Sequence, residues 1–347
     1  MHKPIEGPAG WRGPDLAAST DWTHAMTCRR AILAAMLATG MGLLVTAPAM
    51  AQTYPNRPIK IIVPFAPGGA DVMARLVADR LSASLGQPVI IENRPGGAGG
   101  TVGTKAVTTA DPDGYTLILV SPGPVTVAPA VYKNLDYDPV RQLAPIGMIA
   151  TSPFVLVVHP DVPAKSVAEF VAYSKANPGK VNFVSPGFGT SSHLFGELLK
   201  LRTGAEILHV PYRGATPAIA DLVAGQVQMF FDNIRNLQPF IQSGKLRALA
   251  VTGETRHREM PELPTMIESG IDGFFGYYWN GLLAPAGTPT PIIDRLNAIL
   301  NEGLRSDMRA TVVRLGMEPK FGTPQEFAKF MADETQRWIA VARAANL

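Results

Sequence analysis

The clearest hydrophobic pattern lies at residues 59–85. Residues 59–63 read Ile-Lys-Ile-Ile-Val, a short apolar run that is typical of a buried strand. Residues 72–85 carry Val, Met and Leu at helical spacing, which predicts an amphipathic helix. The segment between them, Phe65–Asp71, contains proline and a pair of glycines and is termed the first loop. The pattern therefore predicts a strand, a tight glycine turn and the N-terminus of a helix.

The same alternation of strand and helix continues to the C-terminus. Short apolar runs predict further strands at 89–93, 115–120, 146–150, 154–159, 181–184, 207–210, 227–231, 246–251 and 281–284. Helical patterns follow at 101–110, at 216–224, from Pro289 or Pro291 to 306, and from Pro324 to about 344. One more helix is predicted to begin at residue 166, and another is predicted to follow the loop 185–193 and to end at about residue 202. Residues 132–144 lack a regular pattern. We therefore expect an α/β fold with mainly parallel sheets and, at 347 residues, two lobes joined by more than one chain crossing.

The first loop has the position of a binding site for an anion. In a parallel sheet, ligands bind at the carboxyl ends of the strands. The first N–H groups of the following helix are unpaired and lie at the positive end of its dipole. The candidate binding residues are Phe65, Ala66, Gly68, Gly69 and Asp71. Alternatively, the glycines only form a tight turn, Phe65 packs between the lobes, and Asp71 only favours the helix dipole.

A second loop, Ser185–His193, also lies between a predicted strand and a predicted helix. Its candidate binding residues are Ser185, Gly187, Gly189, Thr190, Ser191 and His193. Hydroxyl and N–H groups at a helix N-terminus either cap the helix or hold an anion. A serine hydrolase that uses Ser191 or Ser192 with His193 is the alternative, but the Gly-x-Ser-x-Gly pattern of a nucleophile elbow is absent. The sequence therefore favours binding or capping over catalysis.

Other candidate residues lie at or after the ends of predicted strands. Ser121 begins a small Pro-Gly loop, Tyr212 either stacks on a ligand or packs between the lobes, and Asp232 either caps a turn or faces a cleft. The histidines after residue 52 do not have the spacing of metal ligands, so no metal site is expected. The glycine-rich segment 94–100 lacks the dinucleotide fingerprint, and no Gly-Lys-Ser/Thr pair occurs. We therefore expect no cofactor.

Residues 1–51 have the features of a leader for export. An Arg pair at 29–30 precedes an apolar stretch at 31–45, and Ala-Met-Ala at 49–51 matches a signal-peptidase cleavage pattern. Residues 1–25 are longer than an ordinary n-region, which indicates an upstream extension. We expect cleavage after residue 51 and a periplasmic mature chain, with the Sec or twin-arginine route left open.

Composition and charge exclude some kinds of sites and partners. The sole cysteine, Cys28, lies in the leader, so a cleaved chain has neither disulfides nor cysteine-based metal sites. The formal net charge is +3, and no basic stripe with interleaved aromatic residues is present. We therefore expect no nucleic-acid partner.

Several motifs together identify a family. They are Tyr54–Ile59, Val63–Gly69, Glu92–Gly96, Asp111–Leu117, Gly189–Leu194, Val210–Gly214 and Leu246–Thr252. The chain from Thr53 to Leu347 resembles the Bug proteins, which are extracytoplasmic solute receptors of tripartite tricarboxylate transporters. Each motif is ordinary alone, but the combination is specific.

The resemblance implies a two-lobed, type II (Venus-flytrap) periplasmic binding protein that is not an enzyme. It implies that residues 52–150 and 276–347 form lobe one and that residues 151–275 form lobe two. A small carboxylate is expected in the cleft, held by the first and second loops, with membrane transporter subunits as partners and a monomeric chain. The alternatives are a sensing receptor without a transporter and a periplasmic serine hydrolase.

Overall fold

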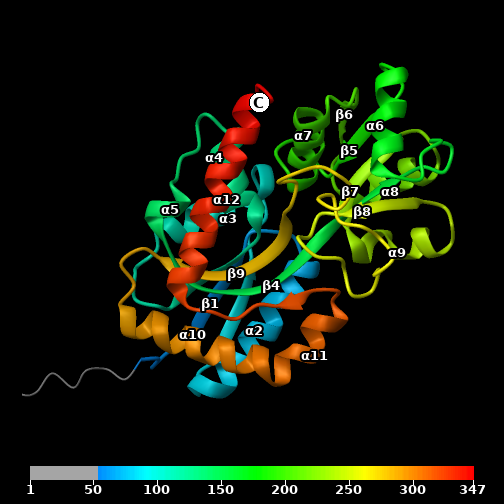
Figure 1. The fold of residues 1–347 in the computed structure, drawn as a ribbon. Coiled ribbons are helices and arrows are strands. Elements are labelled where there is room, and N and C mark those ends of the chain that lie inside the picture. Colours follow the sequence, from blue (N-terminus) through cyan, green and yellow to red (C-terminus); the bar gives the residue numbers. More distant parts are fainter. Residues whose placement is uncertain (1–53) are drawn as a thin grey trace, which may run out of the picture. The chain divides into compact units, whose positions relative to one another are not determined.

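The predicted strand, turn and helix are β1 (Ile59–Val63) and α2 (Gly69–Leu85). The computed structural model describes residues 54–347, so the predicted leader lies outside the described residues. Within residues 54–347 the strands form a mixed sheet in the order β2-β1-β3-β9-β4-β7-β5-β6 (Figure 1). The strands β8 and β10 lie outside this order and pair with β4.

One end of the sheet, termed the first sheet region, contains β2, β1, β3, β9, β10 and the first part of β4. The strands β1, β2 and β3 are parallel, and β9 pairs antiparallel with β3. Their buried Ile, Leu and Val side chains pack against α2 and the C-terminal helices α10 and α11. The additional elements of this region are β2 (Val89–Asn93), η1 (Ala98–Gly100), α3 (Thr101–Thr108), β3 (Thr116–Val120), β9 (Tyr277–Pro285), α10 (Thr290–Arg305), α11 (Asp307–Arg314) and β10 (Glu318–Pro319).

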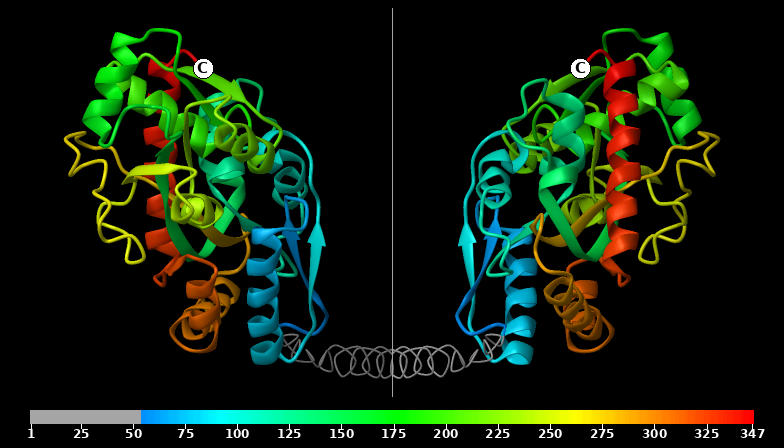
Figure 2. Two further views of the ribbon diagram at one scale, coloured as in Figure 1. Left: turned by 90° about the vertical axis from the view of Figure 1, so that its right-hand side faces the viewer. Right: turned by 90° about the vertical axis from the view of Figure 1, so that its left-hand side faces the viewer.

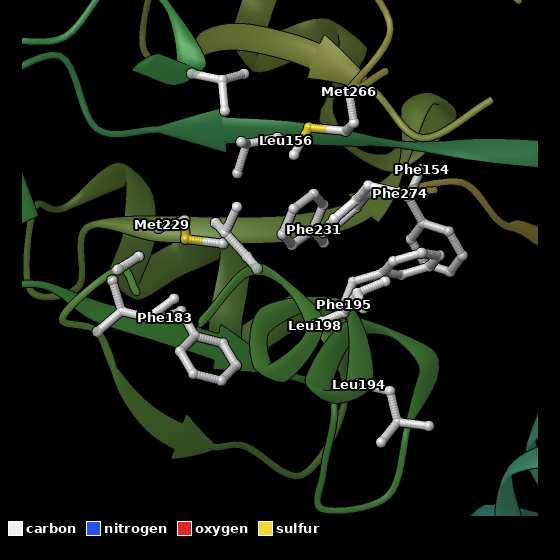
Figure 3. Close-up of a cluster of buried hydrophobic side chains, with 14 of the residues drawn as sticks. Phe154, Leu156, Phe183, Leu194, Phe195, Leu198, Met229, Phe231, Met266 and Phe274 are labelled. Atoms are coloured by element: carbon white, nitrogen blue, oxygen red, sulfur yellow. The ribbon is translucent and has the colours of Figure 1, made fainter. Parts of the chain in front are cut away.

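The other end, termed the second sheet region, contains the last part of β4 with β5, β6, β7 and β8. The strands β5, β6 and β7 are parallel, while β7 and β8 pair antiparallel with β4. An aromatic cluster that includes Phe154, Phe195, Phe231 and Phe274 fills the space between these strands and α7 (Figure 3). The elements are α6 (Val167–Ala176), β5 (Asn182–Ser185), α7 (Ser191–Thr203), β6 (Leu208–Pro211), α8 (Ala215–Val223), β7 (Met229–Asn233), α9 (Ile234–Gln242) and β8 (Arg247–Val251).

The long strand β4 (Leu143–Val158) belongs to both regions. The prediction of separate strands at 146–150 and 154–159 was wrong, because residues 151–153 also pair with β9 and keep the strand continuous. Beyond Pro153 the partners change from β9 to β7 and β8. The predicted parallel pairing holds among β1, β2 and β3 and among β5, β6 and β7, and every antiparallel pair within residues 54–347 involves β4 or β9.

The helix α12 (Pro324–Ala344) begins with a capping box between Thr323 and Glu326. Phe327 packs in the core of the first sheet region, whereas Trp338 packs against Phe195 in the core of the second. The helix thus runs along both regions, and it is the long red helix in Figure 2.

No helix in residues 54–347 is long and apolar enough to cross a membrane.

The segment that lacked a predicted pattern, residues 132–144, contains a short helix. It is α5 (Pro139–Gln142), and the Asp138 carboxylate caps it by accepting from the N–H groups of Val140 and Arg141. Two short helical segments precede it, η2 (Gly123–Val127) and α4 (Ala128–Val131). Local capping rather than hydrophobic periodicity therefore defines this part of the chain.

Candidate ligand-binding site

The first loop leaves the N-terminus of α2 open. Gly68 occupies the N-cap position, so no side chain caps the helix. The N–H groups of residues 69–71 donate to no described acceptor. The residues Ala66, Gly68 and Gly69 are exposed, and a Cβ placed on Gly69 would meet nothing within 4 Å. This end of α2 can therefore receive an anion.

The side chains of the first loop support its backbone. The Nδ2 group of Asn93 donates to the carbonyl oxygen of Phe65 at 3.1 Å. Asp71 is buried and accepts from Arg75 Nε at 2.8 Å, and this contact lowers the pKa of its carboxyl. The carboxylate of Asp71 is thus engaged within α2, which supports a structural role for this predicted site residue.

Gly100 of the glycine-rich segment 94–100 and Gly103 of α3 pack against Pro64, the residue before the first loop. A Cβ on Gly100, where φ is +92°, would lie 2.9 Å from the carbonyl oxygen of Pro64. A Cβ on Gly103 would lie 2.8 Å from the Cα of Pro64. These glycines are needed for close backbone packing, so they support the backbone at the start of the first loop.

The hydroxyl groups and the histidine of the second loop also hold its backbone. The Thr190 hydroxyl donates to the carbonyl oxygen of Gly187 at 2.8 Å. The Gly189 N–H donates to His193 Nδ1 at 3.1 Å, and burial lowers the pKa of His193 to about 4. The His193 ring stacks on His209 with centroids 3.9 Å apart. His193 is therefore a neutral acceptor that shapes the loop.

The helix that follows this loop has an open N-terminus too. Thr190 is the N-cap residue of α7, but its side chain makes no cap hydrogen bond. The N–H groups of residues 191–193 donate to no described acceptor, and the Ser191 hydroxyl has no described hydrogen-bond partner. The two loops therefore offer the same feature, a first helical turn with free N–H groups.

The geometry gives no support to a hydrolase at Ser191 or Ser192. The serine–histidine contact in the described residues is between Ser185 Oγ and His209 Nε2, at 2.7 Å. Ser185 is fully buried, and its Oγ also donates to the carbonyl oxygen of Gly187 at 2.8 Å. Burial lowers the pKa of His209 to about 3. This pair fastens the second loop to β6.

A polar cluster lies where β4 passes from one sheet region to the other. The Tyr278 hydroxyl accepts a hydrogen bond from Asn280 Nδ2 at 3.4 Å, and the Ser121 and Asp232 side chains both affect its pKa, which burial raises. In the strand register, Tyr278 is opposite Ser152 on β4, and Asp232 is opposite Val155. Ser121 of the first sheet region and Asp232 of the second thus both lie within electrostatic range of the same tyrosine.

Asp232 is the charged member of this cluster. It is 3% exposed and accepts from Asn236 Nδ2 at 3.0 Å. Burial raises the pKa of its carboxyl to about 6, above the usual value of 3.8. The Asp232 carboxyl therefore titrates close to neutral pH.

Tyr212 does not join this cluster. Its hydroxyl donates to the Asp221 carboxylate at 2.6 Å, and its ring packs in the core of the second sheet region. No described hydrogen bond or ion pair links the first loop directly to the second. The Tyr132 hydroxyl of the segment after α4 instead donates to the carbonyl oxygen of Phe188 at 3.3 Å.

Sequence reasoning missed Tyr278, Asn280 and Asn236. A signal was present for the first two, because polar Tyr and Asn side chains lie in a buried strand that also contains Trp279. The predicted strand began at residue 281, after these positions. Asn236 lies on α9, which has no predicted counterpart.

Comparison with known proteins agrees with this fold. The model of the tripartite tricarboxylate transporter family receptor matches residues 73–347. Protein BugT of Bordetella pertussis is 42% identical over 304 residues, which cover 86% of this chain and 92% of BugT.

Solved structures are similar over nearly their full lengths. The R. palustris protein Rpa4515 with adipate has a TM-score of 0.75 and 36% identity, covering 84% of this chain and 98% of that chain. The periplasmic binding protein BugD has a TM-score of 0.72 and 37% identity, covering 84% and 99%. MatC from Rhodopseudomonas palustris with bound malate has a TM-score of 0.72 and 35% identity, covering 83% and 100%.

These matches confirm the resemblance predicted from the motifs, and the fold is that of the two-lobed periplasmic binding proteins. The chain therefore belongs to the tripartite tricarboxylate transporter receptor family, which includes the Bug proteins.

Proposed function

We propose that this protein captures a small carboxylate in the periplasm and delivers it to a tripartite tricarboxylate-type transporter. Membership of the receptor family supports solute binding. Two of the similar structures hold carboxylates, adipate in Rpa4515 and malate in MatC. A periplasmic location also fits the leader-like sequence of residues 1–51.

The carboxylate of the ligand binds at the N-termini of α2 and α7. The observation that carries this proposal is that both helices begin without a side-chain cap. Their free N–H groups and positive dipole ends suit an anion. The support around each terminus, from Asn93 behind the first loop and from His193 behind the second, keeps these groups in place.

The two lobes correspond to residues 52–150 with 276–347 and to residues 151–275. The division of the strands into two sheet regions supports this proposal, and Val127, Val131 and Trp338 of lobe one pack in the core of the second sheet region. The strands β4 and β9 and the helix α12 connect the lobes. A ligand that contacts both lobes favours the closed form by its differential affinity for that form.

The protein binds its solute without chemical conversion, as a monomer. The buried Ser185 hydroxyl and the low pKa of His209 argue against nucleophilic catalysis. Within residues 54–347, no group of three or more His, Cys, Asp or Glu side chains forms a metal site. Binding therefore relies on backbone donors and neutral side chains, together with Asp232.

A thermal-shift screen of small carboxylates on the purified mature chain tests the function. A ligand at 100 times its dissociation constant adds about 2.7 kcal/mol to the free energy of unfolding. We expect a stabilising carboxylate, with one-to-one binding in calorimetry and no product by mass spectrometry. If no carboxylate raises the melting temperature, the proposed function is wrong. Uptake of the ligand that depends on this protein would then test the transporter partnership.

A further inference from the structure

The buried carboxylates of residues 54–347 differ in whether a basic side chain accompanies them. Asp71 pairs with Arg75 at 2.8 Å, and Glu197 pairs with Lys200 at 2.9 Å. Glu334 pairs with Arg337 on α12. Asp232 is as buried as these acids, but no described Lys, Arg or His lies within ion-pairing distance of it.

The described neighbours of Asp232 are neutral. The Nδ2 group of Asn236 donates to its carboxylate at 3.0 Å, the backbone of Asn233 lowers the pKa of that carboxyl against the larger effect of burial, and the Tyr278 hydroxyl is within electrostatic range. A buried ion without a counter-ion is costly, because neutral dipoles replace only part of its hydration. An aspartate is therefore rarely fully buried in a protein unless it is paired.

Asp232 lies at the edge of the sheet where we propose that the ligand binds. It lies near the carboxyl end of β7, which pairs parallel with β5, and it is within electrostatic range of the Tyr278 hydroxyl on β9. Parallel strands present their ligands at this end. The adjacent residue Asn233 carries a buried Oδ1 atom that accepts no hydrogen bond from a described residue. The side-chain oxygens at the end of β7 can therefore accept further hydrogen bonds.

We propose that the ligand is an amino-carboxylate whose ammonium group forms an ion pair with Asp232 while its carboxylate binds at the helix N-termini. An ammonium group carries three N–H donors and a positive charge, so it supplies the counter-ion that Asp232 lacks. A second carboxylate at this position would be repelled by Asp232. The proposal rests on the proposed function and specifies its ligand class.

Matched ligands test this preference directly. We would measure thermal shifts with the common L-amino acids, β-alanine and 4-aminobutyrate. The matched analogues are L-lactate for L-alanine, succinate for β-alanine and glutarate for 4-aminobutyrate, in which a hydroxyl or a carboxylate replaces the ammonium group. We expect an amino-carboxylate to bind most tightly, with its analogue at least tenfold weaker. Tighter binding of a dicarboxylate would overturn the proposal but would leave carboxylate binding intact.

The variant Asp232→Asn tests the residue itself. Removal of one partner from a buried charge pair weakens binding by at least about 30-fold. We expect that loss for the amino-carboxylate and a change below threefold, or a gain, for the analogue without the ammonium group. The matched control is Asp161→Asn, because the Asp161 side chain is 90% exposed. Urea unfolding of each variant shows whether it is folded.

The outcomes separate this inference from the proposed function. If the Asp232→Asn variant is folded and binds the amino-carboxylate as tightly as the parent, the ion pair does not exist. If wild-type protein binds no carboxylate of either kind, the proposed function fails and this inference fails with it. A binding preference that shifts toward the dicarboxylate in the variant supports the ion pair.

Discussion

The variant Gly69→Val tests whether the N-terminus of α2 holds the carboxylate. Gly69 is the first residue of this helix, it is exposed, and a Cβ there would meet nothing within 4 Å. Its φ is not in the left-handed region, so valine adopts the same backbone. We therefore expect the free energy of unfolding of the ligand-free variant to stay within about 0.5 kcal/mol of the parent.

The expected effect on affinity is large because the branched side chain occupies the space beside the free N–H groups. A hydrogen bond to a charged group contributes about 1.5–3 kcal/mol. Loss of a pair of such bonds costs about 3–6 kcal/mol, which corresponds to a decrease in affinity of more than 100-fold. Neighbouring elements of the free protein are not expected to move, since they do not touch the new side chain.

Calorimetry with the best ligand from the screen measures this loss. The matched control is Thr290→Val, which places the same side chain at the exposed first residue of α10. We expect the control to bind as tightly as the parent. If Gly69→Val is folded and its dissociation constant lies within threefold of the parent value, the carboxylate does not bind at α2 and our interpretation of the first loop is wrong.

The remaining predictions concern stability, measured by urea unfolding without ligand. Since the folded-state pKa of Asp232 is about 6 and the unfolded value is 3.8, its ionisation destabilises the fold by up to roughly 3 kcal/mol above pH 6. Asp232→Asn should therefore exceed the parent in stability at pH 8, and this advantage should vanish near pH 4; a pH-independent difference would contradict the assignment. Glu334→Gln leaves the half-buried Arg337 without its carboxylate and should cost roughly 3 kcal/mol, whereas an unchanged midpoint would show that the pair contributes nothing. Gly196→Ala places a Cβ 2.1 Å from Phe183 and should cost at least about 1–3 kcal/mol, unless the ring moves freely.

Local sequence determined most of the secondary structure and the first loop. The apolar run at 59–63 and the helical spacing at 72–85 predicted β1 and α2 closely. The Thr323-Pro324 signal marked the start of α12 at the correct residue. These features depend on contacts between residues that are near one another in the chain, so the sequence pattern is sufficient to predict them.

The sequence motifs by themselves also determined the family. Their combination pointed to the Bug proteins, and the match over residues 73–347 confirmed this. The residues in those motifs shape the loops: Asn93 holds the first loop, and Gly189 and His193 hold the second. The sequence could not show that several of the predicted site side chains bind backbone groups of their own loops.

Only the tertiary structure decided how distant segments meet. The continuity of β4 depends on the pairing of residues 151–153 with β9, which is more than 100 residues later in the chain. The same pairing places Tyr278 opposite Ser152 on β4, within electrostatic range of both Ser121 and Asp232. Whether a buried carboxylate has a basic neighbour also depends on packing, because the partner can come from any element. For Asp232 no described element supplies one, and this feature of the folded chain supports the ligand chemistry that we propose.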